Sequence, residues 1–141
     1  MPEGIPYASS NVIAGTGLEL NYIGDHCYAY SGKFSSSTTT QTMINFNTGS
    51  GTIIARIQCN GATADINSST VGNGATTTFT IKVNGIIVAR IKTDTSTEDM
   101  PTTAENELIL PPYTNLTVAA IGTENDDNLT PTINIIGRVY K

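Results

Sequence analysis

The residues best suited to chemistry in this chain are a histidine and a cysteine that are neighbours in sequence, His26 and Cys27. A histidine that shares a proton with a cysteine activates the thiol as a nucleophile. Adjacent side chains of a strand point to opposite faces of a sheet, however, so this pair is poorly placed to share a proton. His26 is also the only histidine, and no second imidazole is present to complete a histidine metal site. We therefore expect His26 to lie at a solvent-exposed edge without a catalytic role.

The second cysteine, Cys59, continues the apolar face of a predicted strand that carries Ile53, Ala55 and Ile57. Unpaired buried cysteines behave as small apolar residues. A disulfide with Cys27 is the alternative, but a chain that stays inside a cell is normally kept reduced. We therefore expect two free, buried thiols.

Acidic residues gather in two places that suit a cation with oxygen ligands. One is the run from Glu124 to Asn128, and the other combines Asp94 with Glu98 and Asp99. Calcium prefers such oxygen donors, but both places lack the glycine and the distal glutamate of a helix-flanked calcium loop. We expect both to be solvated loops, with no metal or other cofactor.

Paired carboxylates across a cleft would indicate a glycosidase. The acids of this chain lie mainly in predicted loops, there is no Trp, and aromatic residues make up only 6% of the sequence, so a platform for stacking sugars is missing. No set of converging polar residues indicates another reaction either. We therefore expect no enzymatic activity and no catalytic residues.

The elements that must position all of these residues are strands. In the segment from Thr78 to Val83, the side chains of Phe79, Ile81 and Val83 fall on one face and polar side chains fall on the other. Eight segments show such a pattern, and none has a convincing apolar stripe at helical spacing. They are approximately Cys27 to Phe34, Gln41 to Asn47, Thr52 to Cys59, Thr76 to Val83, Ile86 to Lys92, Glu107 to Leu110, Asn115 to Ile121 and Thr132 to Tyr140.

The connections between these strands indicate the fold. Asn84-Gly85 predicts a tight hairpin, because both residues accept a positive φ, and the run from Pro111 to Thr114 predicts a corner. Long polar loops are expected at residues 60–75, 93–106 and 122–131. Eight antiparallel strands with one tight hairpin and long crossing loops favour an all-β, two-sheet jelly-roll sandwich over an up-and-down barrel. An immunoglobulin-like sandwich is the runner-up, disfavoured because there is no Trp.

Length and charge limit the partners. The 141 residues fit one domain with one core. The net charge of −5, with only seven scattered Lys and Arg residues, argues against nucleic acid. No apolar run approaches the ~20 residues of a membrane helix, and the start, Met1 to Gly4, lacks the features of a secretory signal. We expect a chain made in the cytoplasm that binds neither nucleic acid nor membranes.

Residues 1–25 are predicted to form an arm, followed by the sandwich domain at residues 26–141. The arm mixes Gly and Pro with apolar residues, so it is too apolar for a disordered tail and too interrupted for a long strand. It is expected to lie on its own sandwich or on a neighbouring subunit. The two alternatives are equally open for Leu18 to Ile23, and the neighbour is favoured for Met1 to Ile13.

Five stretches of the chain share their sequence layout with a known class of proteins. They are Ser10 to Leu20, Tyr28 to Gly32, Lys82 to Arg90, Leu110 to Thr114 and Ile135 to Tyr140. Together they resemble small jelly-roll auxiliary proteins of viral capsids, especially the head decoration or cement proteins of tailed phages. The resemblance implies a trimeric jelly roll on the outer surface of the virion, where it binds the major capsid protein and reinforces contacts between shell subunits. It also implies an arm that reaches a neighbour, and no catalytic residues.

Several predicted strands are apolar on both faces, as expected when a sandwich buries a second surface against a partner. We therefore expect a homo-oligomer, most simply a homotrimer. The expected capsid or subunit contacts are Ile5, Tyr7, Val12, Ile13, Leu18, Leu20, Tyr22, Ile54, Val88 and Ile136.

Cations are also predicted on strand faces opposite the core. They either protect the sheets from unwanted pairing, which is favoured, or form a stripe that faces an acidic partner subunit. These residues are Arg56, Lys82, Arg90, Lys92 and Arg138.

Two other functions fit the same fold. One is a receptor- or glycan-binding head of a viral fibre or tail, which would use the polar loops at residues 60–75, 93–106 and 122–128. The low aromatic content weakens it. The other is a minor capsid subunit, which belongs to the same structural class as a decoration protein.

Overall fold

The structure is a computed structural model that describes residues 16–17, 20–32, 34–64, 76–94, 96–97, 103–126 and 129–140. These residues form strands, turns and loops, and contain no helix. The strands are β1 (Thr16–Gly17), β2 (Leu20–Ile23), β3 (His26–Tyr30), β4 (Gln41–Asn47), β5 (Thr52–Ala64), β6 (Thr76–Val83), β7 (Ile86–Asp94), β8 (Ser96–Thr97), β9 (Thr103–Leu110), β10 (Asn115–Gly122) and β11 (Thr130–Tyr140).

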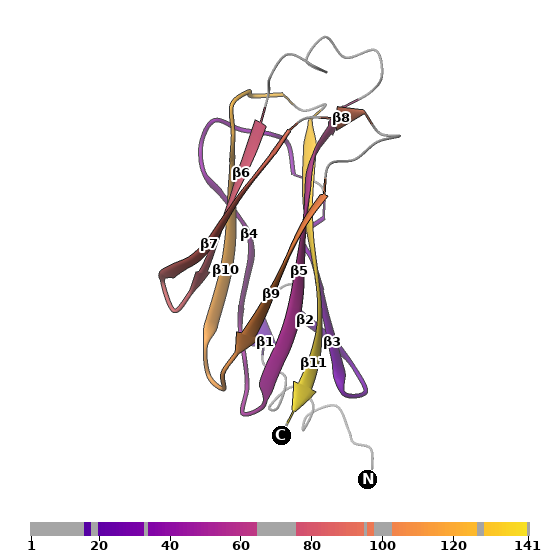
Figure 1. Cartoon of the computed structure of the whole chain (residues 1–141), viewed down its shortest axis with the longest axis vertical. Coiled ribbons are helices and arrows are strands. Elements are labelled where there is room, and N and C mark those ends of the chain that lie inside the picture. Colours follow the sequence, from indigo (N-terminus) through magenta and orange to yellow (C-terminus); the bar gives the residue numbers. More distant parts are fainter. Residues whose placement is uncertain are drawn as a thin grey trace.

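The strands form two sheets that pack face to face (Figure 1). Sheet A has the order β1-β4-β10-β6-β7, and sheet B has the order β2-β3-β11-β5-β9, with the short β8 also beside β5. Without the short strands β1, β2 and β8, the two sheets have four strands each, β4-β10-β6-β7 and β3-β11-β5-β9. Among these eight strands, every connection except the β6–β7 hairpin crosses from one sheet to the other. This arrangement is a jelly roll. The all-β, two-sheet prediction is therefore confirmed.

All eight predicted strands are present, and β4 and β6 have the predicted bounds. The Asn84-Gly85 hairpin is confirmed as well, because Asn84 has a φ of 52° and Gly85 a φ of 80°, which are values of a type I′ turn. All three loop predictions were wrong at their ends. Strand β5 continues to Ala64, β9 already begins at Thr103 and β11 begins at Thr130, inside the segments expected to be loops.

Three strands lie outside the eight predicted ones, namely β1, β2 and β8, and two of them lie in the segment expected to be an arm. For β2, the structure agrees with one of the two alternatives left open for Leu18 to Ile23, a β-strand on its own domain. Strand β2 pairs with β3 through the Gly24-Asp25 turn, and β1 pairs with the end of β4. Leu20 and Tyr22 of β2 pack against the core of their own chain. The sandwich therefore includes residues before 26, and residues 20–23 lie on their own domain. The part of the arm at residues 1–15 lies outside the described residues.

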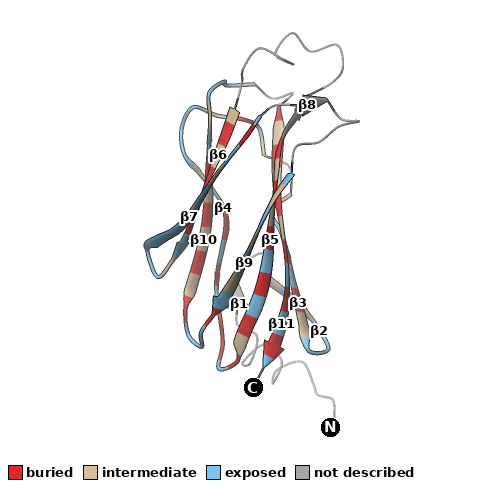
Figure 2. Ribbon diagram, viewed as in Figure 1, coloured by how far each residue is buried: buried red, intermediate tan, exposed pale blue. Residues whose placement is uncertain are grey.

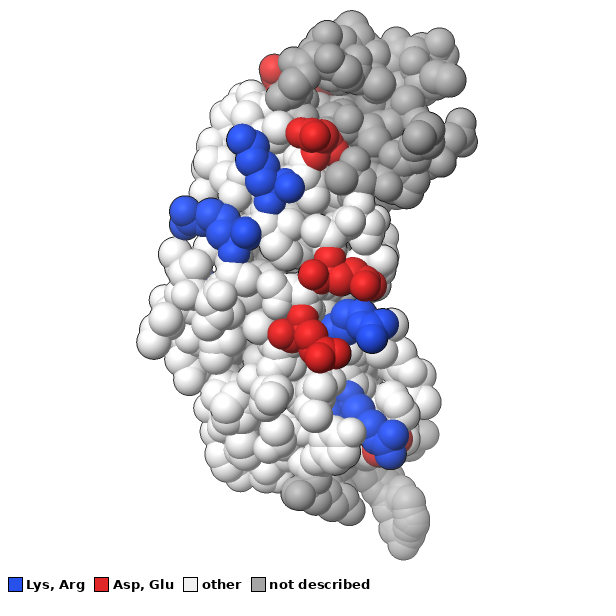
Figure 3. Space-filling model, viewed as in Figure 1, with Lys and Arg blue, Asp and Glu red and all other residues white. Residues whose placement is uncertain are grey.

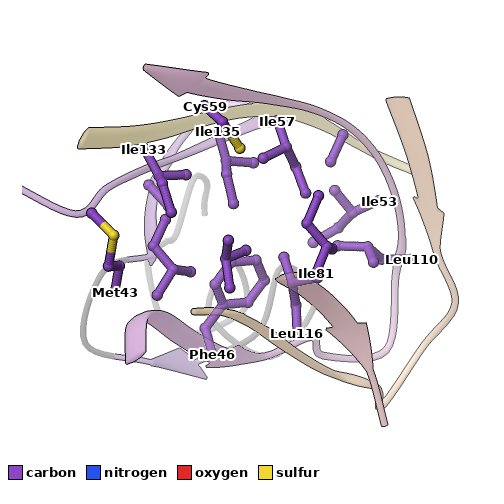
Figure 4. Close-up of a cluster of buried hydrophobic side chains, with 14 of the residues drawn as sticks. Met43, Phe46, Ile53, Ile57, Cys59, Ile81, Leu110, Leu116, Ile133 and Ile135 are labelled. Carbon is purple, nitrogen blue, oxygen red and sulfur yellow. The ribbon is translucent and has the colours of Figure 1, made fainter. Parts of the chain in front are cut away.

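The core fills the space between the sheets, and buried residues alternate with partly or fully exposed ones along residues 52–61 of β5 and along β10 and β11 (Figure 2). Side chains from both sheets point toward one another there (Figure 4). Burying alternate apolar side chains of each strand is what holds two such sheets together. Among the largest fully buried side chains are Ile44, Phe46, Ile53, Ile57, Phe79, Ile81, Leu110, Leu116, Val118, Leu129, Ile133 and Ile135.

Candidate functional site: two apolar surfaces on opposite sheets

His26 and Cys27 point to opposite faces of β3, as the sequence predicts. Cys27 is buried, whereas the His26 side chain is 43% exposed and its Nδ1 lies 2.8 Å from Oδ1 of Asp25. The other carboxylate oxygen of Asp25 lies 3.3 Å from Nη2 of Arg138. His26 is thus part of an exposed ion cluster, and it shares no proton with the thiol.

Both cysteines are free and buried. They lie on β3 and β5, and strand β11 runs between these two strands. Burial raises the pKa of Cys59 to about 12. Burial also raises the pKa of Cys27 to about 11, against a smaller lowering by a hydrogen bond with the backbone of Gly137. Because the thiolate is the reactive form, neither thiol is activated as a nucleophile near neutral pH.

The described part of the acidic loop is tied to the segment before β4. Ser36 Oγ donates to the carbonyl oxygen of Glu124 at 2.9 Å, and Asn125 Oδ1 accepts from the backbone N–H of Thr38 at 2.9 Å. No group of three or more His, Cys, Asp or Glu residues that could hold a metal occurs in the described ranges. Asp127, Asn128, Glu98 and Asp99 lie outside them.

The outer face of sheet B carries large apolar side chains from all five of its main strands. We call these residues the apolar face: Ile23 (β2), Tyr28 (β3), Ile136 and Tyr140 (β11), Ile54 (β5) and Ile109 (β9). Each is between 38% and 69% exposed. The register places Ile136 opposite Tyr28 on one side, and Ile54 opposite Ile109 on the neighbouring pair of strands. Polar side chains lie between some members of the apolar face, since His26 and Arg138 separate Ile23 from Ile54 in the register. Exposed apolar patches are typical of protein–protein contact surfaces.

The other half of the same outer face is polar apart from Tyr30, which is 52% exposed and lies opposite Asn134, and its amides hydrogen-bond with one another and with neighbouring threonines. Asn60 Nδ2 donates to Thr132 Oγ1 at 2.9 Å and to Asn134 Oδ1 at 3.1 Å, and Thr103 Oγ1 donates to Asn60 Oδ1. Asn134 Nδ2 donates to Gln58 Oε1 at 2.9 Å. The apolar face is therefore a bounded patch, confined to the half of sheet B where β5 begins and β11 ends.

Charged residues of both signs lie within the apolar face. Arg138 pairs with Asp25, and its guanidinium lies 5.6 Å from the ring centroid of Tyr140. Arg56 lies opposite Glu107 in the register of β5 and β9. The patch thus carries two cations and two anions, although the whole chain has a net charge of −5.

A second exposed apolar surface lies at the tip of the β6–β7 hairpin. Ile86, Ile87 and Val88 are 69%, 49% and 46% exposed, and we call them the hairpin tip. They belong to β7, the edge strand of sheet A, and the register of β7 against β6 shifts at Ile81/Lys82. A bulge of this kind twists the edge strand β7 and hinders its pairing with a strand of another molecule. A partner would therefore contact the side chains of the hairpin tip rather than its backbone.

The predicted basic stripe is divided between the two sheets. Lys82 lies on β6, and Arg90 and Lys92 lie on β7, where both are exposed. Arg56 and Arg138 lie on sheet B, next to acidic residues. In the space-filling view, basic side chains accordingly appear in two separate areas (Figure 3).

The predicted contact residues have three different outcomes. Ile54 and Ile136 lie in the apolar face and Val88 in the hairpin tip, so all three are exposed. Leu20 and Tyr22 pack against the core of their own chain instead. Five others lie outside the described residues, namely Ile5, Tyr7, Val12, Ile13 and Leu18.

Sequence reasoning missed four members of the apolar face, namely Ile23, Tyr28, Ile109 and Tyr140. Their signal was the same alternation that revealed the core, because each occupies the outward position of its strand.

Among the residues that the structure describes, no helix is long and apolar enough to cross a membrane. No family model and no curated protein matches the chain, so its function has to be inferred from these two surfaces.

Proposed function

We propose that this protein is a structural, non-enzymatic subunit of a virion: a capsid decoration or cement protein that binds the outer shell and stabilises it by bridging capsid subunits. The observation that carries the proposal is the pair of apolar surfaces on different sheets. A subunit that bridges others needs at least two contact surfaces, and the apolar face and the hairpin tip supply them.

The sequence resemblance supports the same role. Its stretches Tyr28 to Gly32 and Ile135 to Tyr140 contain outward residues of the apolar face, and the stretch Lys82 to Arg90 contains the hairpin tip. The features that resemble decoration proteins are thus, in good part, the exposed apolar surfaces. The jelly-roll topology agrees with that resemblance, although this fold hosts many functions.

Within this proposal, the hairpin tip contacts the shell. The tip is short, apolar and next to the cations Lys82 and Arg90, so it fits a small apolar depression with an acidic rim. Interface energy is usually concentrated in a few buried side chains. Removing one of the three tip residues should therefore weaken binding strongly.

The test adds the purified full chain to shells that lack decoration. We expect saturable binding at a fixed copy number, and a rise in the temperature at which the shells break open. Ile87→Lys should reduce the affinity by at least about tenfold, because it places a charge in the contact. Ile121→Lys is the matched control, since Ile121 is an exposed isoleucine on β10 of the same sheet and lies outside the tip. Failure of the wild-type protein to bind any such shell would refute the proposal.

A further inference from the structure

We infer that the apolar face of sheet B is the contact surface for a second copy of this chain, with the two copies related by a two-fold axis along β11. The inference deepens the proposed function, because it names the chain itself as one of the two partners that the subunit contacts. It differs from the homotrimer implied by the sequence resemblance, and that trimer remains a separate prediction.

The strand order makes the face symmetric enough to pair with itself. β11 is the middle strand of β2-β3-β11-β5-β9, so a two-fold axis along it lays β3 over β5 and β2 over β9 of the second copy. Ile136, at the centre, then meets Ile136 of the second copy. Residues in such an isologous contact meet reciprocally, so every favourable pair occurs twice.

In the row of Ile136, the side chains that this axis brings together are complementary, whereas the row of Arg138 also places His26 over Ile54 of the second copy. Tyr28 and Arg56 flank Ile136 at equal distance in the register, on β3 and β5. The axis therefore places each Tyr28 over Arg56 of the second copy, which is a cation–π arrangement. In the next row, Ile23 and Ile109 lie at the two edges of the sheet and meet as an apolar pair.

Charge also favours this face over the rest of the surface. Two copies with a net charge of −5 repel each other in general. On the apolar face, however, Arg56 and Arg138 are balanced by Asp25 and Glu107. Arg138 lies on β11, so the proposed axis places it against Arg138 of the second copy, and the ion pair of each Arg138 with its own Asp25 lowers the repulsion between the two guanidinium groups.

The size of the face sets the strength of the contact. Five strands about 4.8 Å apart, with about five residues of each contributing, give a footprint on the order of 400 Å² per copy. A standard stable interface buries about 800 Å² per partner. Pairing of free subunits should therefore be weak, with a Kd of roughly 10 μM to 1 mM, and should strengthen when a shell holds the copies close together.

The test is sedimentation equilibrium of the full chain, without any shell, from about 10 μM to 1 mM. We expect a concentration-dependent rise from the monomer mass toward the dimer mass. Ile136→Lys should weaken the association at least about tenfold, because it puts two lysines on the axis. Ile121→Lys, on the outer face of the other sheet, should associate like the wild type. Thermal unfolding would check that both variants are folded.

The symmetry has its own readout. Ile136→Cys should be joined into a covalent dimer by a short bis-maleimide, because the new thiols face each other across the axis, whereas Ile121→Cys should not. Cys27 and Cys59 are buried and should stay unmodified in both variants. A monomer mass at every concentration, a trimer mass, or unchanged association of Ile136→Lys would each overturn the inference. Shell binding is measured separately, so a failure here is distinguishable from a failure of the proposed function.

Discussion

Thr48 and Thr114 lie 66 residues apart in sequence and close one end of the sandwich together. Thr48 Oγ1 accepts a hydrogen bond from the backbone N–H of Thr114 at 2.8 Å and donates to the carbonyl oxygen of Pro111 at 2.9 Å. Thr114 Oγ1 donates to the same carbonyl at 2.9 Å, and the backbone N–H of Thr48 donates to the carbonyl oxygen of Thr114. Both threonines are buried, so water cannot hydrogen-bond with them freely. The four bonds instead satisfy both hydroxyls, both backbone N–H groups and the carbonyl oxygens of Pro111 and Thr114.

Thr48→Val should therefore destabilise the protein by about 1 to 3 kcal/mol, because it leaves the Thr114 N–H without its side-chain acceptor in a buried place. The free energy of unfolding in urea measures the loss. Thr48→Ser keeps the hydroxyl and is the control, with an expected loss under about 1 kcal/mol. Equal losses in the two variants would contradict the role of the hydroxyl.

Gly137 of β11 lies where inward side chains of both neighbouring strands, β3 and β5, leave no room for a Cβ. A Cβ at this position would lie 2.7 Å from Cγ2 of Ile53 and 2.9 Å from Sγ of Cys27. Gly137→Ala should therefore destabilise the protein by about 1 to 3 kcal/mol through overpacking. Cys27→Ala removes the sulfur, so the loss in Cys27→Ala/Gly137→Ala should be smaller than the sum of the two single losses. Additive losses in this double-mutant cycle would show that the sulfur does not limit the site.

Thr77 has a buried hydroxyl without a hydrogen-bond partner. Thr77→Val replaces the hydroxyl by a methyl group of similar size, and should raise the free energy of unfolding by roughly 1 kcal/mol. Thr78→Val, one residue further along β6 on the outer face, controls for the strand preference of valine and should change stability by less than about 0.5 kcal/mol. A loss of stability in Thr77→Val, measured by thermal unfolding, would mean that the hydroxyl has a partner in solution.

The raised pKa values of Cys27 and Cys59 predict a loss of stability in alkali. The unfolded chain releases the thiol protons near the ordinary pKa of 9.0, whereas the folded chain keeps them until about 11 for Cys27 and about 12 for Cys59. The thiols' contribution is therefore complete below pH 9 and is lost as the pH rises toward 11 and 12.

Between pH 8 and pH 10, the wild type under reducing conditions should accordingly lose about 2 to 3 kcal/mol more than Cys27→Ala/Cys59→Ala, since each thiol contributes about 1.3 kcal/mol over this range. The comparison uses the change with pH within each protein, so the cavities left by the two alanines cancel. Other residues that titrate in this range are present in both proteins. Parallel pH profiles would show that the thiols are solvated in the folded state.

Much of the fold was predictable because local patterns specify it. Alternating apolar residues predicted the bounds of β4 and β6, and Asn84-Gly85 predicted the hairpin that joins β6 to β7. Each of these signals depends on only a few adjacent residues. The start of β9 was missed because its inward positions there are Ala104 and Asn106, which do not stand out from polar neighbours. For strand β2 the sequence left two alternatives open, because the strand is short and lies among the glycines of the predicted arm.

The candidate surfaces were predictable only in part. Ile54 and Ile136 were identified because apolar residues occupied both faces of their strands, but their assembly with Ile109 and Tyr28 depends on which strands become neighbours. The same limit applies to the contact of Gly137 with Cys27. Pairing between distant segments is set by the packing of the whole sandwich, and no local pattern encodes it.

The place of β11 has a consequence for how the molecule is made. This strand follows all others in sequence, yet it lies between β3 and β5 and pairs with both. Before β11 is in place, sheet B is therefore divided into β2-β3 on one side and β5-β9 on the other. Pairing between segments far apart in sequence slows folding, so the inward side chains of both parts stay without their β11 neighbours until this late pairing forms.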